Sequence, residues 1–459
     1  MSKESKSLWA LIEREIEAYF NEVDTLPVFP KVDSNRLFKD LESFHFQEKR
    51  DPEEAIQFVV RHLRESHLQT AHPAYFGVFN PAADPMGIAG EWLVAAFNPQ
   101  LASWTSSPFA IAVEQHLLGY WSRKFGLPEN SCGTFTSGGT EANHTALLTA
   151  LTRHFPSFGK KGLHGLAGIP VLYGSKETHH SILKSARLCG LGTEAVREIS
   201  TDSNQKMKVA ELEKRIRQDR KEGFIPFLIV GTAGSTSQGA IDPLDSLADV
   251  AERENLWLHV DAAWGGAAVL VPELLPHFKG IERADSITLD AHKWLNVPMT
   301  AGMFMCRHPS ILRETFSVDF SPYMPADSHG SSLPQPFQES MGWSRRFRGL
   351  ELFLAFAVTG EEGYCKTLRN QVKMGVRLRE MLSEAGWKVL GTTPLPVVCF
   401  EGELPSEEIA KRVADSGRSW ITTTHFEGRT VLRAGIANYR TTEKDLKTLV
   451  DTLSAVSRI

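Results

Sequence analysis

The chain has 459 residues, of which 42% are hydrophobic and 23% are charged, a composition typical of globular proteins and unlike extended disorder. At about 100–200 residues per domain, this length predicts two or three domains. The formal net charge of −5 argues against a nucleic-acid or anionic-membrane partner. The five cysteines are scattered and form no CxxC pair, so the sequence indicates neither a disulfide framework nor a cysteine-based zinc site.

The N-terminal residues predict a helix and no targeting segment. The first 20 residues are charged throughout, and no apolar run approaches the ~20 residues of a membrane span, so we expect a cytoplasmic location. Apolar residues at helical spacing predict an amphipathic helix over residues 3–22. Residues 1–70 contain too few apolar positions to form a core of their own, so we expect them to pack on another domain or on the partner subunit.

The rest of the chain predicts an α/β fold in two parts. Residues 71–345 alternate between apolar strand-like runs and helices, which predicts a large domain with a mostly parallel sheet. Near the end of this part, residues 317–342 are rich in Ser, Pro and Gly and predict a mobile loop. Residues 346–459 combine helices with short strands, which predicts a smaller α+β C-terminal domain.

Four polar clusters follow predicted strands, which is where ligands bind in open α/β sheets. The first cluster has Ser137, the Gly138–Gly139 pair and Thr140 directly before a helix. Free N–H groups at the helix start and the hydroxyl donors favour a phosphate, although a plain Ser/Gly turn explains the same residues. A nucleoside-triphosphate loop is excluded because no Lys follows the glycines.

The next two clusters offer an imidazole and a carboxylate. His179 and His180 end a predicted strand, where an imidazole can stack on a flat ring, carry protons or simply line a helix start. Adjacent strand residues face opposite ways, so we expect no metal here. Asp261 ends a buried strand beside the small residues Ala262–Ala263 and Gly265–Gly266, which would leave room for a flat ligand. A lone Asp in such a place is otherwise structural.

The fourth cluster contains Lys293, which follows the strand SITL and is flanked by Trp294, Leu295 and Val297. Burial lowers the pKa of a lysine, so we expect an amine able to form a Schiff base; a solvated surface charge is the ordinary alternative. Together the four clusters match pyridoxal 5′-phosphate (PLP). Lys293 would bind its aldehyde, and Asp261 would keep its pyridine nitrogen protonated.

The sequence resembles the group II PLP-dependent amino-acid decarboxylases, which include aromatic-L-amino-acid, histidine, glutamate and diaminobutyrate decarboxylases. The resemblance runs from about residue 70 to the C-terminus and is carried, in the family's order, by HPAYFGVFNPAADP, NPQLASWTSSPFAIAVEQ, GTFTSGGTEANHTAL, HVDAAWGG, SITLDAHKW, RRFRGLELF and VLRAGIANYRTTEKDL. It implies a fold of the PLP-dependent transferase type (fold type I) and a homodimer with shared active sites. The implied reaction converts an L-amino acid to its amine and carbon dioxide.

The resemblance also implies roles for individual residues. It places the Schiff base on Lys293, the pyridine-nitrogen partner on Asp261, and His180 and Ala263 on the two faces of the ring. The other residues expected around the cofactor are Gly138, Gly139, Thr140, Thr236, Asp290 and His292, with Trp343 and Ser344 from the partner subunit. The residues expected around the substrate are Val78, Phe79 and Asn80, with Gln100 and Ala102 from the partner subunit.

One departure from the family leaves the product open. The family's mobile loop usually carries a Tyr that protonates the substrate Cα, and here its position falls on Phe337, which has no proton to donate. Tyr323 could act instead from the same loop, or His180 could protonate Cα. Alternatively, decarboxylation is coupled to oxidative deamination and yields an aldehyde. We favour the simple decarboxylase.

The substrate side chain and the competing reactions also stay open. Val78 and Ala102 are small, and Asn80 and Gln100 are polar, so an aliphatic or polar amino acid is at least as consistent as an aromatic one. Arg433 could meet a substrate carboxylate or serve as a structural ion-pair partner. Transaminase or other lyase chemistry on the same scaffold is one alternative. A catalytically silent cofactor-binding dimer is another, which the intact site residues oppose.

Overall fold

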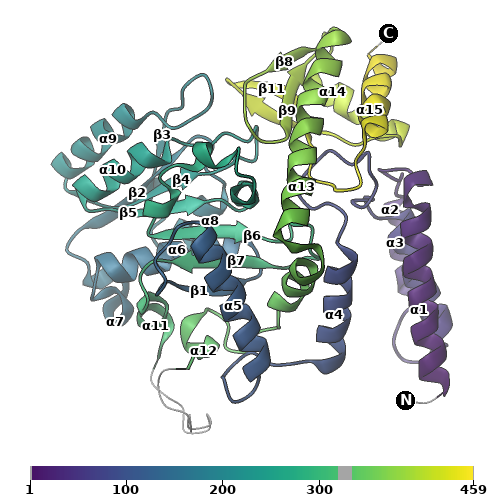
Figure 1. Ribbon diagram of the computed structural model, residues 1–459, viewed down its shortest axis with the longest axis horizontal. Helices are drawn as coiled ribbons and strands as arrows, with labels where there is room; N and C mark the ends of the chain where they lie inside the picture. The colour runs from purple at the N-terminus through teal and green to yellow at the C-terminus, as the bar shows by residue number, and fades with distance from the viewer. Residues whose placement is uncertain (1–2, 319–332, 458–459) are drawn as a thin grey trace. The chain divides into compact units, whose positions relative to one another are not determined.

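The computed structural model describes residues 3–318 and 333–457, which fall into two units (Figure 1). The larger unit consists of residues 83–372 and 391–397. The smaller unit consists of residues 1–82, 373–390 and 398–459. The sequence predicted different limits, with a C-terminal domain that begins at residue 346.

A seven-stranded sheet lies at the centre of the larger unit, in the order β1-β7-β6-β5-β4-β2-β3. Its strands are β1 (Cys132–Thr136), β2 (Ile169–Ser175), β3 (Val196–Ile199), β4 (Phe224–Thr232), β5 (Trp257–Asp261), β6 (Ser286–Asp290) and β7 (Gly302–Cys306). Of these strands, β7 alone runs antiparallel to its neighbours. Every residue of β5, β6 and β7 is buried, as in sheets covered on both faces. The mostly parallel α/β fold is therefore confirmed.

Helices pack around this sheet. They are α4 (Pro85–Phe97), α5 (Pro108–Lys124), α6 (Gly139–His154), α7 (Phe158–Lys161), α8 (Ser181–Leu188), α9 (Val209–Lys221), α10 (Leu244–Glu254), α11 (Ile311–Phe316), α12 (Pro336–Glu339) and the first part of α13 (Gly349–Glu384). Helix α6 packs across β4 to β7, while α9 and α10 pack against β4 and α5 against β1. Because α6 follows β1 directly, its N-terminus lies where the carboxyl ends of the parallel strands meet.

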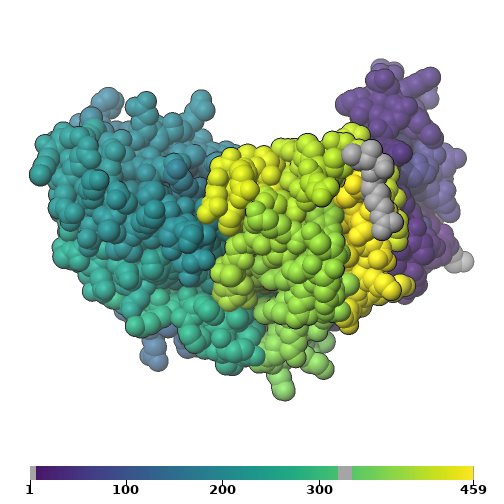
Figure 2. All heavy atoms as spheres, turned by 90° about the horizontal axis from the view of Figure 1, so that it is seen from above, coloured from purple at the N-terminus to yellow at the C-terminus, as the bar shows by residue number. Residues whose placement is uncertain are grey.

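The smaller unit contains a four-stranded sheet in the order β10-β11-β9-β8. Its elements are α1 (Lys3–Glu22), α2 (Ser34–Glu42), α3 (Pro52–Glu65), β8 (Lys388–Leu390), β9 (Val397–Glu401), α14 (Ser406–Ser416), β10 (Thr422–Phe426), β11 (Arg429–Gly435), α15 (Glu443–Val456) and the rest of α13. Figure 2 shows the purple N-terminal helices of this unit beside its yellow C-terminal residues. The two regions share one core, in which Tyr75 and Phe76 pack with Ile409 and Leu432. They therefore form one unit, where the sequence predicted a separate segment over residues 1–70.

Three helices begin at an Asp that accepts their first free N–H groups. Asp33, Asp51 and Asp84 each accept hydrogen bonds from two backbone N–H groups, at the starts of α2, α3 and α4. In α3 and α4 the next residue is Pro, whose fixed φ and missing N–H suit the first helical position. Helix α1 covers the residues that the apolar spacing predicts.

The loop predicted at residues 317–342 is described only in part. Residues 319–332, which include Tyr323, lie outside the described ranges, and the following residues include α12. Within the described ranges, every helix is too short or too polar to cross a bilayer.

A buried carboxylate connects α5 to the start of α13. Glu114 is 2% exposed, and its Oε2 lies 2.6 Å from Nη1 of Arg345. Its Oε1 accepts hydrogen bonds from the N–H groups of Arg348 (3.0 Å) and Gly349 (3.2 Å). One side chain thus neutralises a buried guanidinium and caps a helix start.

We predict that Glu114→Gln destabilises the protein by about 3 kcal/mol, because breaking a buried pair leaves a charge without its partner. The free energy of unfolding, from urea titration followed by circular dichroism, checks this. The control is Glu361→Gln, which breaks the exposed ion pair with Lys124 and should cost less than about 1 kcal/mol. Equal losses from the two variants would contradict the role given to Glu114.

Candidate active site

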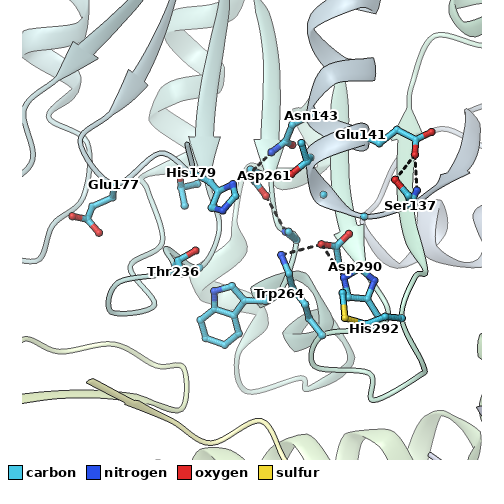
Figure 3. Close-up of a pocket in the computed structure, with 18 residues that line it drawn as sticks. Ser137, Glu141, Asn143, Glu177, His179, Thr236, Asp261, Trp264, Asp290 and His292 are labelled. Atoms are coloured by element: carbon cyan, nitrogen blue, oxygen red, sulfur yellow. Dashed lines mark hydrogen bonds and ion pairs between the residues drawn. The ribbon is translucent and has the colours of Figure 1, made fainter. Parts of the chain in front are cut away.

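The carboxyl ends of β1, β4, β5 and β6 surround a cavity of about 320 Å³ in the larger unit (Figure 3). This volume lies within the range of small-ligand sites, about 300–1,000 Å³. The cavity brings together residues that the sequence singled out, namely Gly138, Gly139, Thr140, Thr236, Asp261, Ala263, Asp290, His292 and Lys293. These residues are far apart in the chain, and the order of the strands makes them neighbours.

The start of α6 forms a cradle that depends on its glycines. Gly138 has φ +146°, in the region that favours glycine, and a Cβ there would lie 3.2 Å from Cε1 of His292. A Cβ on Gly139 would lie 2.9 Å from Oδ2 of Asp290. A side chain at either position would therefore fill the space beside the first N–H groups of α6. A helix start with free N–H groups and this space beside it suits an anion such as phosphate.

His292 stands beside this cradle with a defined proton position. Its Nδ1 accepts a hydrogen bond from the N–H of Ala301 (3.0 Å), so the neutral ring carries its proton on Nε2. Burial lowers the pKa of His292, although the carboxylate of Asp290 opposes this effect. His292 is therefore a neutral N–H donor near the start of α6.

Lys293 is held by carboxylates, and its electrostatics differ from the sequence prediction. Its Nζ lies 2.9 Å from Oδ2 of Asp290. Burial alone lowers the pKa of the amine, but the carboxylates of Asp290 and Asp261 outweigh burial and hold this pKa above its ordinary value. The prediction that burial lowers the pKa of Lys293 was therefore wrong, because two acidic strand ends face the amine.

Asp261 is anchored at the end of β5. Its Oδ2 accepts a hydrogen bond from Nδ2 of Asn143 (2.7 Å), and its Oδ1 accepts one from the N–H of Ala263 (3.1 Å). The neighbouring glycines have a role other than the predicted one. A Cβ on Gly265 would lie 2.2 Å from the carbonyl oxygen of Ala233. Gly265 thus permits close packing against the backbone of Ala233, Gly266 adjoins the side chains of Ala262 and Leu289, and neither glycine lines the cavity.

The structure places His179, rather than the predicted His180, at the cavity. His179 lines the cavity beside Asp261, whereas His180 lies outside the lining and precedes the first turn of α8 (Figure 3). The reason is a local cap, because Nδ1 of His179 accepts the N–H of Ser181 at 3.2 Å and this bond turns the ring inward. The His-x-Ser spacing before a helix was the signal in the sequence that could have identified His179.

Two further cavity residues were missed from the sequence. Asn143 is 1% exposed, and a polar residue on the buried face of α6 was the available signal. Glu177 lies at the Thr236 end of the cavity (Figure 3). Burial raises the pKa of Glu177 to about 7, with the carboxylate of Asp242 acting in the same direction. No sequence pattern indicated Glu177.

Other predicted site residues gather elsewhere in the larger unit. Nε2 of Gln100 donates to Oγ of Ser344 (2.8 Å), and the N–H of Phe337 donates to the carbonyl of Ala102 (3.0 Å). The rings of Phe337 and Trp343 have centroids 5.0 Å apart. None of these five residues lines the cavity.

The remaining predicted substrate residues belong to the smaller unit. There the hydroxyl of Tyr75 donates to Asn80, and the guanidinium of Arg433 lies 4.6 Å from the ring centroid of Phe79. Val78 is 41% exposed.

A parallel sheet whose strand ends bring a lysine, a carboxylate and a glycine-lined helix start to one cavity defines a PLP-dependent enzyme. A family model described as the pyridoxal-dependent decarboxylase conserved domain matches residues 36–402. The chain belongs to this family and is a PLP-dependent carboxy-lyase that converts amino acids to amines.

The relatives cover most of the chain. L-2,4-diaminobutyrate decarboxylase from Rhizobium meliloti is 33% identical over 422 residues, which cover 88% of this chain and 82% of that protein. Aromatic-L-amino-acid decarboxylase from Bacillus atrophaeus is 28% identical over 457 residues, which cover 96% and 92%. The crystal structure of mouse CSAD is similar with a TM-score of 0.90 and 25% identity, and the match covers 98% of each chain.

We predict that Asp290→Asn lowers the pKa of Lys293, because it removes one of the two carboxylates that raise it. More of the amine is then unprotonated at any given pH, so its reaction with an aldehyde shifts to lower pH. Reductive methylation of the apoprotein with formaldehyde across a pH series, followed by mass spectrometry of the Lys293 peptide, measures the midpoint.

The matched control is Glu141→Gln, which changes another cavity carboxyl that bonds Ser137 instead of the lysine. Its midpoint should equal that of the unmodified protein. A midpoint that stays constant or rises in Asp290→Asn would contradict the electrostatic account of Lys293.

Proposed function

We propose that this cavity is the active site of the decarboxylase and that Lys293, Asp261 and His179 are its working groups. One observation carries the proposal: an amine, a carboxylate and a glycine-lined helix start, delivered by three different strand ends, line the same cavity. The amine, the carboxylate and the helix start each have an ordinary structural explanation when taken alone. Their convergence on one cavity large enough for a small ligand is explained by a binding and catalytic role.

The residues present fit PLP. The start of α6, with Gly138, Gly139 and the N–H of His292, would hold the phosphate. Asp261 would hold the proton of the pyridine nitrogen, and Lys293 would bind the aldehyde carbon. When bound, PLP supplies an electron sink for the electron pair that carbon dioxide leaves behind.

The protein's own contribution is positioning and exclusion of water. Ala263 and His179 would cover the two faces of the flat ring, and Trp264, which is 2% exposed, limits the water beside them. In such surroundings the attraction between Asp261 and a protonated nitrogen is stronger than in water. Lys293 must give up the proton that Asp290 stabilises before its amine can react.

The proposed product is the amine and not an aldehyde. Phe337 packs against Trp343, and the amine is proposed because the chain belongs to a family of amino-acid decarboxylases. His179 replaces His180 as the cavity imidazole that could return a proton to the substrate Cα. Tyr323 stays a prediction.

We expect the holoenzyme, supplied with a panel of L-amino acids, to release carbon dioxide and amine in equal amounts without hydrogen peroxide. Lys293→Ala should lower turnover by roughly 10³-fold or more, as the loss of a covalent catalytic group does elsewhere. The control is Lys184→Ala, an exposed lysine on α8, which should leave turnover unchanged. Peroxide equal to carbon dioxide would overturn the proposed product, and full activity of Lys293→Ala would overturn the site.

The substrate class is proposed from the smaller unit and the partner subunit together. Val78 and Asn80, with Gln100 and Ala102 of the partner, suit an aliphatic or polar side chain at least as well as an aromatic one. Arg433 is 2% exposed, its Nε and Nη2 have no hydrogen-bond partner, and no ion pair involves it among the described residues. Its Nη1 donates to the carbonyl of Gly77 and its guanidinium lies over the ring of Phe79, so a structural role accounts for Arg433 as well as a substrate carboxylate does.

We infer further that the active form is a cytoplasmic homodimer with shared active sites. Gln100, Trp343 and Ser344 gather away from the cavity of their own chain, as expected of residues that serve a neighbour. Large apolar side chains are exposed nearby on α4, including Phe97 at 81%, and such exposure is typical of an interaction surface. All five cysteines are free, which suits a reducing compartment.

We predict that two inactive variants, Lys293→Ala and Trp343→Ala, restore activity when they are mixed under conditions that exchange subunits. In a mixed dimer one site carries both changes and the other carries neither. Random exchange of equal amounts should therefore recover about a quarter of the original activity. Steady-state assays before and after exchange measure it, and no recovery would contradict sharing of the site.

A further inference from the structure

Asn143 occupies the centre of a buried hydrogen-bond network behind the cavity. Its Nδ2 donates to Oδ2 of Asp261 (2.7 Å) and to Oγ of Ser181 (2.8 Å). Its Oδ1 accepts from Oγ1 of Thr288 (2.9 Å) and lies 3.0 Å from Nε2 of His259. Every hydrogen-bonding position of this amide is therefore used. Because a carboxylate only accepts hydrogen bonds, the nitrogen of the amide must face Asp261.

This orientation determines the protons on the inner side of the network. Since Oδ1 of Asn143 accepts, the proton of His259 is on Nε2. Nε1 of Trp257 donates to Oγ of Ser286 (2.9 Å), which leaves the Ser286 hydroxyl proton for Nδ1 of His259, also at 2.9 Å. Burial lowers the pKa of His259 to about 4, which agrees with a neutral ring. His259 and Thr288, on the inner side of the network, thus donate hydrogen bonds to Oδ1 of Asn143, and the His259 ring is uncharged.

The outer side of the network reaches the cavity imidazole. Ser181 accepts from Asn143, so its own hydroxyl proton is directed to Nδ1 of His179 at 2.8 Å. The backbone N–H of Ser181 points to the same nitrogen at 3.2 Å. Two donors leave Nδ1 of His179 as an acceptor, so the neutral ring carries its proton on Nε2.

We propose that Asn143 and Ser181 are positioning residues of this decarboxylase. Asn143 holds the Asp261 carboxylate in place, and the same amide, acting through Ser181, fixes His179 in the tautomer that offers an Nε2–H to the cavity. The inference rests on the proposed function, in which Asp261 meets the pyridine nitrogen and His179 covers the ring. Figure 3 shows Asn143, Asp261 and His179 converging from α6, the end of β5 and the turn before α8.

The shared amide has a consequence that separate contacts would not have. Asp261 and Ser181 bind the two hydrogens of one rigid NH₂ group, so rotation of the amide breaks both bonds together. The orientation of the Asn143 amide therefore determines both the position of the Asp261 carboxylate and the tautomer of His179. Changes at Asn143 should affect both groups, whereas changes at Ser181 should affect His179 and leave the anchor of Asp261 in place.

The first experiment reads the tautomer directly and needs no cofactor. In ¹⁵N-histidine-labelled protein, two-bond ¹H–¹⁵N correlation separates protonated from unprotonated ring nitrogens, and His179→Gln assigns the signal. We expect Nε2 of His179 to be protonated, and Ser181→Ala to produce a mixture of tautomers. Ser185→Ala is the matched control, because the Ser185 hydroxyl is buried on the same helix without a partner. A proton on Nδ1 in the unmodified protein would overturn the proposal.

The second experiment measures the anchor of Asp261 in the holoenzyme. Asn143→Ala removes a hydrogen bond to a charged group, so we expect the dissociation constant of PLP to rise about tenfold or more. The pH dependence of the cofactor's absorbance should shift as well. Thr149→Val is the control, since it alters a buried hydroxyl of α6 that bonds only within the helix. Unchanged affinity and an unchanged pH profile in Asn143→Ala would overturn the positioning role.

Asp261→Asn separates this inference from the proposed function. If Asp261→Asn changes the affinity and the spectrum while Asn143→Ala changes neither, the positioning role alone is wrong. If Asp261→Asn changes neither, the proposed role of Asp261 is wrong, and the inference that rests on it falls too. Should Asn143→Ala fail to fold, Asn143→Ser keeps one donor for Asp261 and is tested in the same way, with a smaller rise expected.

Discussion

The ion pair between Lys293 and Asp290 is the constraint around which the site is arranged. A partly buried ammonium group is stabilised by a partner, and parallel strands deliver that partner because their carboxyl ends meet at one edge of the sheet. Asp290 and Asp261 come from neighbouring strands of this edge, so the amine faces two carboxylates. The charge that makes Lys293 stable also makes it a weaker nucleophile.

Much of the fold and about half of the cavity lining could be predicted from the sequence. Strands such as β4 and β5 are apolar without alternation, and each is followed by a helix, which is sufficient for a mostly parallel sheet. Asp261, His292 and Lys293 follow such strands, and their convergence is a consequence of strand order. The sequence identifies the end of a strand from local residues alone. In every parallel α/β sheet the carboxyl ends of the strands lie at the same edge, so residues at strand ends can be predicted to lie together.

The failures have physical reasons of a different kind. His179 and His180 are equivalent by composition, and only the hydrogen bond from Ser181 decides which ring faces the cavity. The pKa of Lys293 depends on Asp261, at the end of another strand, and on Asp290, a carboxylate only three residues away that the burial argument left out. The core of the smaller unit joins N-terminal residues such as Val28 to the C-terminal strands and helices, and the sequence pattern does not show this contact. The contacts of His179 with Ser181 and of Lys293 with Asp290 are local, whereas the contribution of Asp261 and the core of the smaller unit depend on segments far apart in the chain.

The two glycine pairs illustrate how a site and a packing contact can share one sequence signal. Gly138 and Gly139 keep space open at a helix start, whereas Gly265 lets one backbone approach another and Gly266 packs against core side chains. The distinction lies in what a Cβ would meet: the cavity side chains Asp290 and His292 in the first case, and chiefly backbone and core atoms in the second. Asn143 shows the same principle for polar residues. Its amide is buried like a structural group, yet its hydrogens bind Asp261, which lines the cavity, and Ser181, which bonds the cavity residue His179.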